Sequence, residues 1–143
     1  MRSGDNSLSK TIQLAASLPA PPDRLFDMYL DPAVHAAFTG APVTISNISG
    51  APFSAFGGVL SGTVLQVVPK RLIVQSWRSP HWGDSDIDST LILTFHPEKE
   101  GGRIELVQIN VVESDFAGVC HGWEKFYWTP WRAYLTRGKQ GDG

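Results

Sequence analysis

The segment from Gly122 to Leu135 is crowded with aromatic side chains, and this crowding constrains the fold more than any other feature. It holds three of the five tryptophans and two of the three tyrosines. At about 100° per residue, a helix would gather one broad aromatic face, made of Trp123, Tyr127, Trp131 and Tyr134. A helix with so bulky an apolar face must pack against a large concave surface.

The neighbours of this face set its edges. Phe126 and Pro130 flank it on one side, Trp128 and Leu135 flank it on the other, and the solvent side carries Lys125, Thr129 and Arg132. Because proline has no N–H to donate to the carbonyl of Phe126, we expect the helix to kink or restart at Pro130. The helix should pack in the core with Trp123 buried. A compatible alternative is that part of the face lines a ligand cavity.

The composition indicates a single globular domain. The length of 143 residues fits a single domain, expected over 11–137, with 1–10 and 138–143 as flexible tails. A net charge of −2 with scattered basic residues argues against nucleic-acid binding. No apolar run approaches the roughly 20 residues of a membrane span. The single cysteine, Cys120, and the absence of a signal-like apolar core near Met1 favour a cytoplasmic location.

The hydrophobic pattern then predicts the order of elements. Alternation over Ile12–Leu18 indicates a first strand, and Pro22 starts a helix that ends at Asp31-Pro32. A second short helix is expected over Ala33–Phe38. Beyond it the period changes to two, and the predicted strands are Val43–Ile48, Pro52–Phe56, Val59–Val68, Arg71–Arg78, Thr90–Phe95 and Arg103–Val112. Antiparallel strands with helices on one face give an α+β fold.

Two positions in this pattern stay open. In the last strand, Gln108 and Asn110 share a face with Ile104 and Leu106, whereas the opposite face carries Val107, Ile109 and Val111. Either set is apolar enough to point inward. Similarly, Trp77 reads as a core residue, while its neighbour Arg78 either faces solvent, stacks on an indole or pairs with Asp84 or Asp86.

Signatures of metal and catalytic sites are largely missing. The spacing of Asp84, Asp86 and Asp88 resembles the start of a calcium loop, but Ser89 and Phe95 occupy positions that require Gly and Glu. Isolated histidines are usually surface or capping residues, and this chain has four of them, His35, His81, His96 and His121. We therefore expect no metal, no cofactor and no catalytic residue.

Several motifs together resemble a known family. They are Gly57-Gly58 through Gly62, Pro69 through Leu72 to Trp77-Arg78, the loop with Trp82, Gly102 through Gln108, and Gly122-Trp123 through Tyr134-Leu135. This ordered set, spanning about Thr11 to Leu135, resembles the activators of the heat-shock protein 90 ATPase (Aha-type). More closely, it resembles their C-terminal domain and single-domain bacterial relatives.

The resemblance implies the helix-grip fold, also called START-like, SRPBCC or birch-pollen-allergen-like. In that fold a curved antiparallel sheet of about six to seven strands wraps a long C-terminal helix, and two short helices follow the first strand. The eukaryotic co-chaperones carry a further N-terminal domain for which this chain leaves no room. Another departure is Ser49–Phe53, where many relatives have Gly-Gly before the aromatic. The family supplies no catalytic residues to transfer.

Function is expected to be binding rather than catalysis. The first hypothesis is a module, monomeric or homodimeric, that takes a small apolar or amphipathic molecule, or a partner protein segment, between sheet and last helix. Glycines in the strands would curve the sheet away from that helix. The residues expected to line the site are Trp77, Trp82, Gln108, Trp123, Phe126, Tyr127 and Trp131.

Two alternatives remain. By analogy alone, the chain is a chaperone-associated stress protein like the heat-shock protein 90 ATPase activators. Alternatively, it is a cyclase- or hydrolase-type enzyme, which would need an acid or base in the cavity. Glu105 and Glu113 are the first candidates for that role. Most acidic residues lie in loop-like stretches, which makes the enzyme the least favoured reading.

Overall fold

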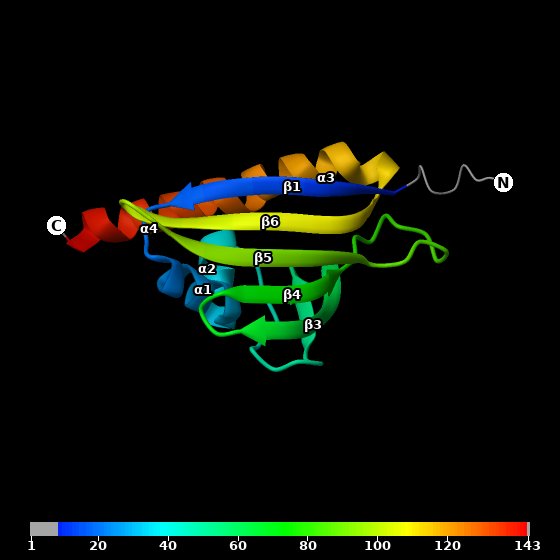
Figure 1. Ribbon diagram of the computed structural model, residues 1–143, viewed down its shortest axis with the longest axis horizontal. Helices are drawn as coiled ribbons and strands as arrows, with labels where there is room; N and C mark the ends of the chain where they lie inside the picture. Colours follow the sequence, from blue (N-terminus) through cyan, green and yellow to red (C-terminus); the bar gives the residue numbers. More distant parts are fainter. Residues whose placement is uncertain (1–8, 143) are drawn as a thin grey trace.

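The structure is a computed structural model that describes residues 9–142. Six strands form one antiparallel sheet in the order β1-β6-β5-β4-β3-β2 (Figure 1). Their bounds are β1 Ser9–Leu18, β2 Pro52–Ala55, β3 Leu60–Val68, β4 Leu72–Trp77, β5 Ser89–Glu98 and β6 Gly101–Val112. The strands from β3 to β6 follow one another as antiparallel neighbours, and β1 closes the order beside β6.

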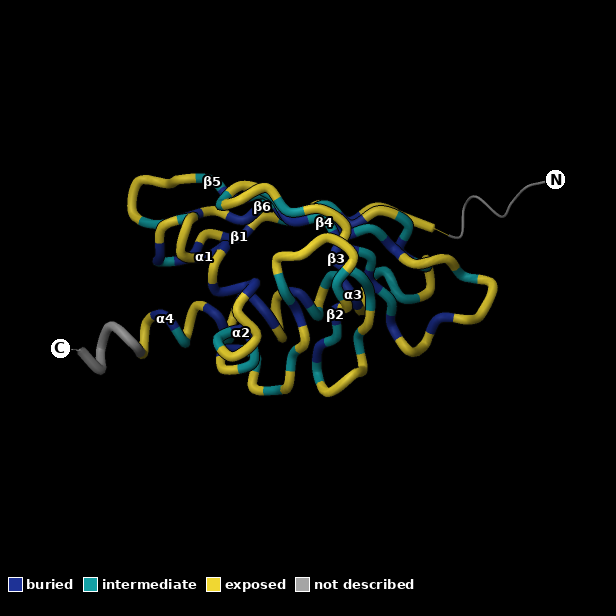
Figure 2. Tube along the Cα trace, turned by 90° about the horizontal axis from the view of Figure 1, so that it is seen from below, coloured by how far each residue is buried: buried dark blue, intermediate teal, exposed yellow. Residues whose placement is uncertain are grey.

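All helices gather on one face of this sheet. Two short helices follow β1, α1 Pro22–Leu30 and α2 Pro32–Thr39. After β6 the chain runs through a 3₁₀ turn, Glu113–Asp115, then α3 Phe116–Gly122, a π-helical turn, Trp123–Trp128, and α4 Thr129–Asp142; we call these together the C-terminal helical segment. Figure 2 shows β1, β4, β5 and β6 as one layer with α2, α3 and α4 below it, and β2, at the end of the strand order, lies at the level of these helices. This arrangement is the predicted helix-grip α+β fold.

The break between the two short helices lies where the sequence predicts it. Pro22 occupies the first turn of α1, where its missing N–H leaves no carbonyl unsatisfied. Asp31 caps α2, because its Oδ1 accepts hydrogen bonds from the N–H groups of Ala33 at 2.9 Å and Val34 at 3.2 Å. The second helix therefore starts at Pro32, one residue before the predicted start.

Strand β6 changes the face it presents to the core part-way along its length. Ile104, Leu106 and Gln108 point inward and are almost fully buried. Asn110 then adopts a φ of 70°, and the register between β6 and β1 shifts. A bulge of this kind adds one residue to a strand, which moves the following side chains to the other face. Val111 is consequently the next buried residue, so each predicted alternation is right for one part of the strand.

The predicted strand at Val43–Ile48 is wrong. Only Thr44 pairs there, in an isolated bridge with Ser54. The chain turns before a ladder can extend, because the Ser46 hydroxyl accepts a hydrogen bond from the N–H of Ile48 at 3.3 Å. Gly50 then donates its N–H to the carbonyl of Val64 at 2.7 Å, which ties the turn to β3.

The C-terminal helical segment restarts before Pro130, as predicted, through a π-helical turn. The N–H of Thr129 bonds the carbonyl of Glu124, five residues back, and regular α-helix resumes at Thr129. A π turn holds one extra residue, which rotates the following side chains by about 100° relative to an unbroken α-helix. Trp128 and Leu135 are therefore buried, whereas Phe126 is 47% exposed and Tyr134 only half-buried.

Aromatic rings connect this segment to α2. Phe38 stacks on Trp131 with ring centroids 4.3 Å apart, and Trp131 in turn stacks near Trp128 at 6.5 Å. Trp128 stacks on Trp123 at 5.5 Å, and Trp123 packs against Tyr127 at 4.7 Å. This continuous row fills much of the space between helices and sheet, as the aromatic composition predicts.

The expected domain limits stay a prediction. Of the two tails, residues 1–8 and 143 lie outside the described residues. Within the described part, Ser9 and Lys10 pair with Val112 and Val111 in the sheet, and α4 continues to Asp142. No helix within residues 9–142 combines the length and the apolar character needed to cross a membrane.

Candidate functional site

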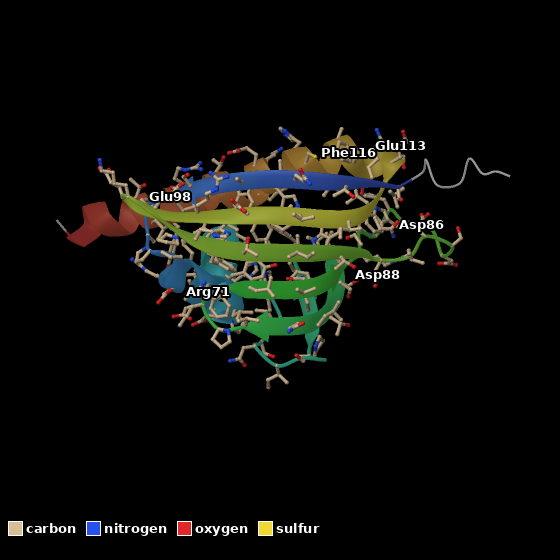
Figure 3. The ribbon with its side chains drawn as sticks, in the orientation of Figure 1. Arg71, Asp86, Asp88, Glu98, Glu113 and Phe116 are labelled. Atoms are coloured by element: carbon tan, nitrogen blue, oxygen red, sulfur yellow. The ribbon has the colours of Figure 1, made fainter. Side chains whose placement is uncertain are left out.

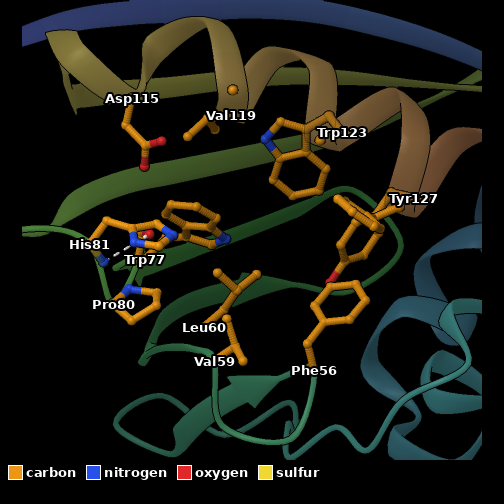
Figure 4. Close-up of a pocket in the computed structure, with 14 residues that line it drawn as sticks. Phe56, Val59, Leu60, Trp77, Pro80, His81, Asp115, Val119, Trp123 and Tyr127 are labelled. Atoms are coloured by element: carbon orange, nitrogen blue, oxygen red, sulfur yellow. Dashed lines mark hydrogen bonds between the residues drawn. The ribbon is translucent and has the colours of Figure 1, made fainter.

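A cavity of about 400 Å³ lies between the C-terminal helical segment and the β2–β4 end of the sheet. From the helical side it is lined mainly by Asp115, Val119, Trp123, Phe126 and Tyr127, and from the sheet side by Phe56, Val59, Leu60, Trp77, Pro80 and His81 (Figure 4). Most of this lining is aliphatic or aromatic. The aromatic row therefore leaves part of the space unfilled.

The turn between β2 and β3 forms one edge of the cavity. Phe56, Gly57 and Gly58 all adopt left-handed backbone conformations, with φ of 54°, 68° and 96°. The two glycines adopt this conformation without steric strain, because they have no Cβ that would clash with the backbone. The turn brings the Phe56 ring to 5.7 Å from that of Phe126 and 6.0 Å from that of Tyr127. These contacts close one end of the cavity.

Of the seven residues expected to form the site, four line this cavity, namely Trp77, Trp123, Phe126 and Tyr127. The other three, Trp82, Gln108 and Trp131, are buried and do not line the cavity. Trp131 belongs to the row that reaches α2. The role of the four lining residues in ligand binding stays a prediction.

Trp82 supports the wall from the loop after β4. Its ring packs 5.8 Å from that of Trp77, and its Nε1–H donates to Oδ2 of Asp115 at 2.8 Å. Arg78 holds the same loop by donating to the backbone carbonyls of Gly83 and Asp86. Its ion pair is with Asp88 at 3.1 Å, so of the alternatives left open by the sequence Arg78 pairs with a carboxylate, although not with that of Asp84 or Asp86. Figure 3 shows Asp86 on this loop, beyond the sheet, and Asp88 nearer to β5.

Gln108 fixes the orientation of Trp123. Its Oε1 accepts a hydrogen bond from Nε1–H of Trp123 at 2.9 Å, and its Nε2 donates to the Ser89 hydroxyl at 3.0 Å. The Ser89 hydroxyl donates to the backbone carbonyl of Trp77 at 2.8 Å. A buried, satisfied chain of this kind gives side chains one preferred arrangement. It connects the indole of Trp123 to the backbone carbonyl of Trp77, a residue that lines the opposite wall.

A second buried chain holds Tyr127 through His35. Nδ1 of His35 lies 2.8 Å from the carbonyl of Tyr29, and its Nε2 lies 2.8 Å from the Tyr127 hydroxyl. A carbonyl can only accept, so Nδ1 carries the proton and the Tyr127 hydroxyl donates to Nε2. Burial lowers the pKa of His35 from its ordinary 6.5 to about 4, so the ring is neutral at neutral pH. Burial also raises the pKa of Tyr127, which keeps its hydroxyl protonated.

Comparison with known proteins decides the family. The family described as "Activator of Hsp90 ATPase homolog 1-like protein" matches residues 19–136. The chain belongs to this family. An "Activator of 90 kDa heat shock protein ATPase homolog" from Dictyostelium discoideum is 28% identical over 118 residues, which cover 82% of this chain and 30% of that protein. The human "Activator of 90 kDa heat shock protein ATPase homolog 1" is 25% identical over 116 residues, which cover 81% of this chain and 34% of that protein. The chain thus spans about a third of the length of these curated relatives.

Solved structures confirm the Aha-type fold. An HSP90 activator from Plasmodium falciparum superimposes with a TM-score of 0.77 at 20% identity, and the superposition covers 88% of this chain and 96% of the activator's chain. A protein from Mesorhizobium loti gives a TM-score of 0.77 at 21% identity, with 90% and 98% coverage. At these identities the likeness establishes the fold alone.

The carboxylates first considered for catalysis lie away from the cavity of this Aha-type domain. Glu105 is on the outer face of β6, where it pairs with Arg103 at 3.0 Å, and Glu113 pairs with Lys10 at 3.9 Å. Besides Tyr127, whose raised pKa keeps its hydroxyl protonated, the titratable residues that line the cavity are Asp115 and His81. Within the described part of the chain, no three His, Cys, Asp or Glu side chains gather as metal ligands would.

Sequence reasoning missed two kinds of residue. The expectation that isolated histidines lie on the surface or cap helices is wrong for His35, which is fully buried beneath Tyr127. The apolar neighbours Val34 and Phe38 on the same short helix were the sequence signal that could have indicated the burial of His35. Asp115 and His81 were missed as lining residues because each lies outside a regular strand, where hydrophobic periodicity gives no direction.

Proposed function

We propose that this Aha-type domain is a binding module, not an enzyme, and takes one small apolar or amphipathic molecule in the cavity beneath its C-terminal helical segment. The observation that carries the proposal is the cavity itself, about 400 Å³ and mostly aromatic or aliphatic in lining. Sites for small molecules typically measure about 300–1,000 Å³ and are largely apolar with few polar groups.

The preorganised walls support binding. Trp123 is fixed by Gln108, and Tyr127 is fixed by His35, so neither ring needs to lose freedom when a ligand enters. Holding such side chains in place before binding avoids an ordering cost of about 0.5–1.5 kcal/mol per side chain. Access is available at the rim, where Val59 is 52% exposed and Phe126 is 47% exposed.

A substitution that fills the cavity tests this proposal. Val59 lines the cavity and is half-exposed, so Val59→Trp should place an indole at the rim without disturbing the core. We expect the wild-type protein to bind the neutral dye Nile red saturably at one per chain. Its melting temperature should rise with ligand concentration, as mass action requires. The Val59→Trp variant should bind at least about tenfold more weakly, equivalent to roughly 1.4 kcal/mol.

The matched control is Ile48→Trp. Ile48 is 65% exposed on a turn and does not line the cavity, so this variant adds the same indole elsewhere and should bind like the wild type. Native mass spectrometry of freshly purified protein would reveal a ligand retained from the cell. The proposal fails if neither Nile red nor a panel of apolar molecules binds the wild type saturably, or if Val59→Trp binds as well as Ile48→Trp.

Family membership favours a second candidate function, a chaperone-associated role in stress. Residues 19–136 match the family of Hsp90 ATPase activator homologues, and the curated relatives carry that activity in their names. Such a role would place the protein in the cytoplasm with its chaperone. Stimulation of ATP turnover by a purified Hsp90 of the same organism would support it, and unchanged turnover at saturating protein would reject it.

A further inference from the structure

We propose that the polar end of the ligand is a cation, so that the cavity is built for a cationic amphiphile such as an alkylammonium. This inference rests on the proposed binding function and specifies its ligand. Among the described residues that line the cavity, Asp115 is the only one with a formal charge, and no lysine or arginine is among them. A single carboxylate in an apolar enclosure favours a positive group and disfavours a fatty-acid anion.

The carboxylate of Asp115 has capacity for another donor. Its Oδ2 accepts one hydrogen bond, from Nε1–H of Trp82 at 2.8 Å. A carboxylate offers about four acceptor positions, so most remain for a ligand. The bond to Trp82 also holds the group in place, because Trp82 is only 7% exposed and packs on Trp77. The negative charge is therefore fixed at the start of the C-terminal helical segment.

The aromatic walls suit the same kind of ligand. Cations are attracted to the faces of tryptophan, tyrosine and phenylalanine rings, most strongly to tryptophan, and this attraction grows when water is excluded. Figure 4 shows Asp115, His81 and Trp77 at one end of the cavity, and Phe56 and Tyr127 at the other. Phe126, at the rim, already has the ammonium of Lys125 5.4 Å from its ring centroid.

This placement gives the cavity two chemically different ends. A cationic head would lie at the end of the cavity that is lined by Asp115, Trp77 and His81. The hydrocarbon body would extend along Val119, Trp123 and Leu60 towards Phe56 and Tyr127. At that far end the Tyr127 hydroxyl is already engaged with His35 Nε2. An amphiphile bound in this orientation would place no charge in the apolar end of the cavity.

Three probes of equal chain length test the inference, namely decylammonium, 1-decanol and decanoate, each titrated by tryptophan fluorescence and calorimetry. The two ions are kept below their micelle concentrations and decanol below its solubility limit. We expect the ammonium to bind at least about tenfold more tightly than decanoate, with decanol between them. Raising the salt concentration should weaken ammonium binding and leave decanol binding nearly unchanged.

Asp115→Asn and Glu113→Gln form a matched pair of variants, because each removes one negative charge. The asparagine keeps an oxygen that can accept from Trp82, so the wall should stay intact. Glu113 pairs with Lys10 and does not line the cavity. We expect Asp115→Asn to weaken ammonium binding about tenfold and decanol binding less than about twofold, whereas Glu113→Gln should change neither.

The outcomes separate this inference from the proposed function. If decanol binds as tightly as the ammonium, or if the two variants behave alike, the cationic ligand is wrong while the binding function stands. If decanoate binds most tightly, the inference is also overturned. If none of the three probes binds while Nile red does, the inference is overturned and the binding function stands. If neither the three probes nor Nile red and the apolar panel bind, the proposed function itself fails. The salt dependence of the wild type gives an independent result that does not rely on any variant.

Discussion

Replacing Trp123 with alanine is expected to lower the free energy of unfolding by about 3–5 kcal/mol, the usual cost of truncating a buried tryptophan. Trp123 is 3% exposed and packs against both Tyr127 and Trp128. Its loss also leaves Oε1 of buried Gln108 without the donor it has now. The loss is a large share of a typical total stability of about 5–15 kcal/mol, so urea denaturation should show a much lower midpoint.

Two variants separate the causes of this loss. Trp123→Phe keeps an aromatic ring but removes the donor to Gln108, which should cost about 1–3 kcal/mol for an unsatisfied buried acceptor and a smaller ring. Phe126→Ala truncates a neighbouring aromatic that is 47% exposed, and should cost about 1 kcal/mol or less. If Trp123→Ala unfolds at the wild-type urea concentration, the indole is not the core element described here.

Acidification is expected to destabilise the protein through His35. The pKa of this ring is about 4 in the folded protein and 6.5 as its ordinary value, so between these limits the unfolded chain binds more protons. The contribution of His35 is therefore complete above pH 6.5, decreases as the pH falls, and is lost by about pH 4. At 1.36 kcal/mol per pKa unit the total loss is about 3 kcal/mol. Tyr29 and Tyr127 face the ring and stay neutral throughout this range.

The difference between variants isolates this contribution from other titrating groups. Unfolding free energies measured from pH 7 to pH 4 should fall less steeply in His35→Gln than in the wild type. His81→Gln alters an exposed histidine, and its profile should parallel that of the wild type. Parallel wild-type and His35→Gln profiles would mean that His35 is not held neutral by burial, and that Tyr127 lacks the partner assigned to it.

Most of the fold follows from patterns that the sequence displays locally. The alternation in β1 predicts the inward set of Ile12, Ala16 and Leu18, because strand side chains alternate faces whatever the neighbouring strand. The Asp31-Pro32 pair predicts the helix break for a similarly local reason, since Asp31 caps the helix that Pro32 begins. The family resemblance adds the order of the strands around the last helix, which local patterns do not contain.

The missed features depend on contacts between distant residues. The bulge at Asn110 inverts β6 only because β1 pairs across it, so the sequence offers two equal alternations. The π turn before Pro130 adds one residue to the helical period, and a fixed 100° step then misplaces Phe126 and Trp128. The predicted strand at Val43–Ile48 has suitable residues, but the Ser46 turn ends its pairing after one bridge.

The candidate site is predictable in its aromatic part and not in its polar part. Of the four expected residues that line the cavity, three come from the C-terminal helical segment, because large aromatic side chains on one helix face must meet the curved sheet, and Trp77 comes from β4. Trp131 lies too far along the helix and stacks on Phe38 instead. Asp115 enters the lining through a 3₁₀ turn whose direction is set by Trp82, a residue more than thirty positions earlier in the chain.

The most direct test of ligand binding is a solution NMR titration of the isotope-labelled protein with decylammonium or 1-decanol. We predict saturable shifts in the amides of Gly118, Val119 and Gly122, with nuclear Overhauser contacts from the decyl chain to Leu60 and to the rings of Trp123 and Tyr127. Ile109 and Leu65 are exposed residues that do not line the cavity and should not respond. Shifts that do not saturate, or contacts confined to such outer positions, would contradict a ligand site between the sheet and the last helix.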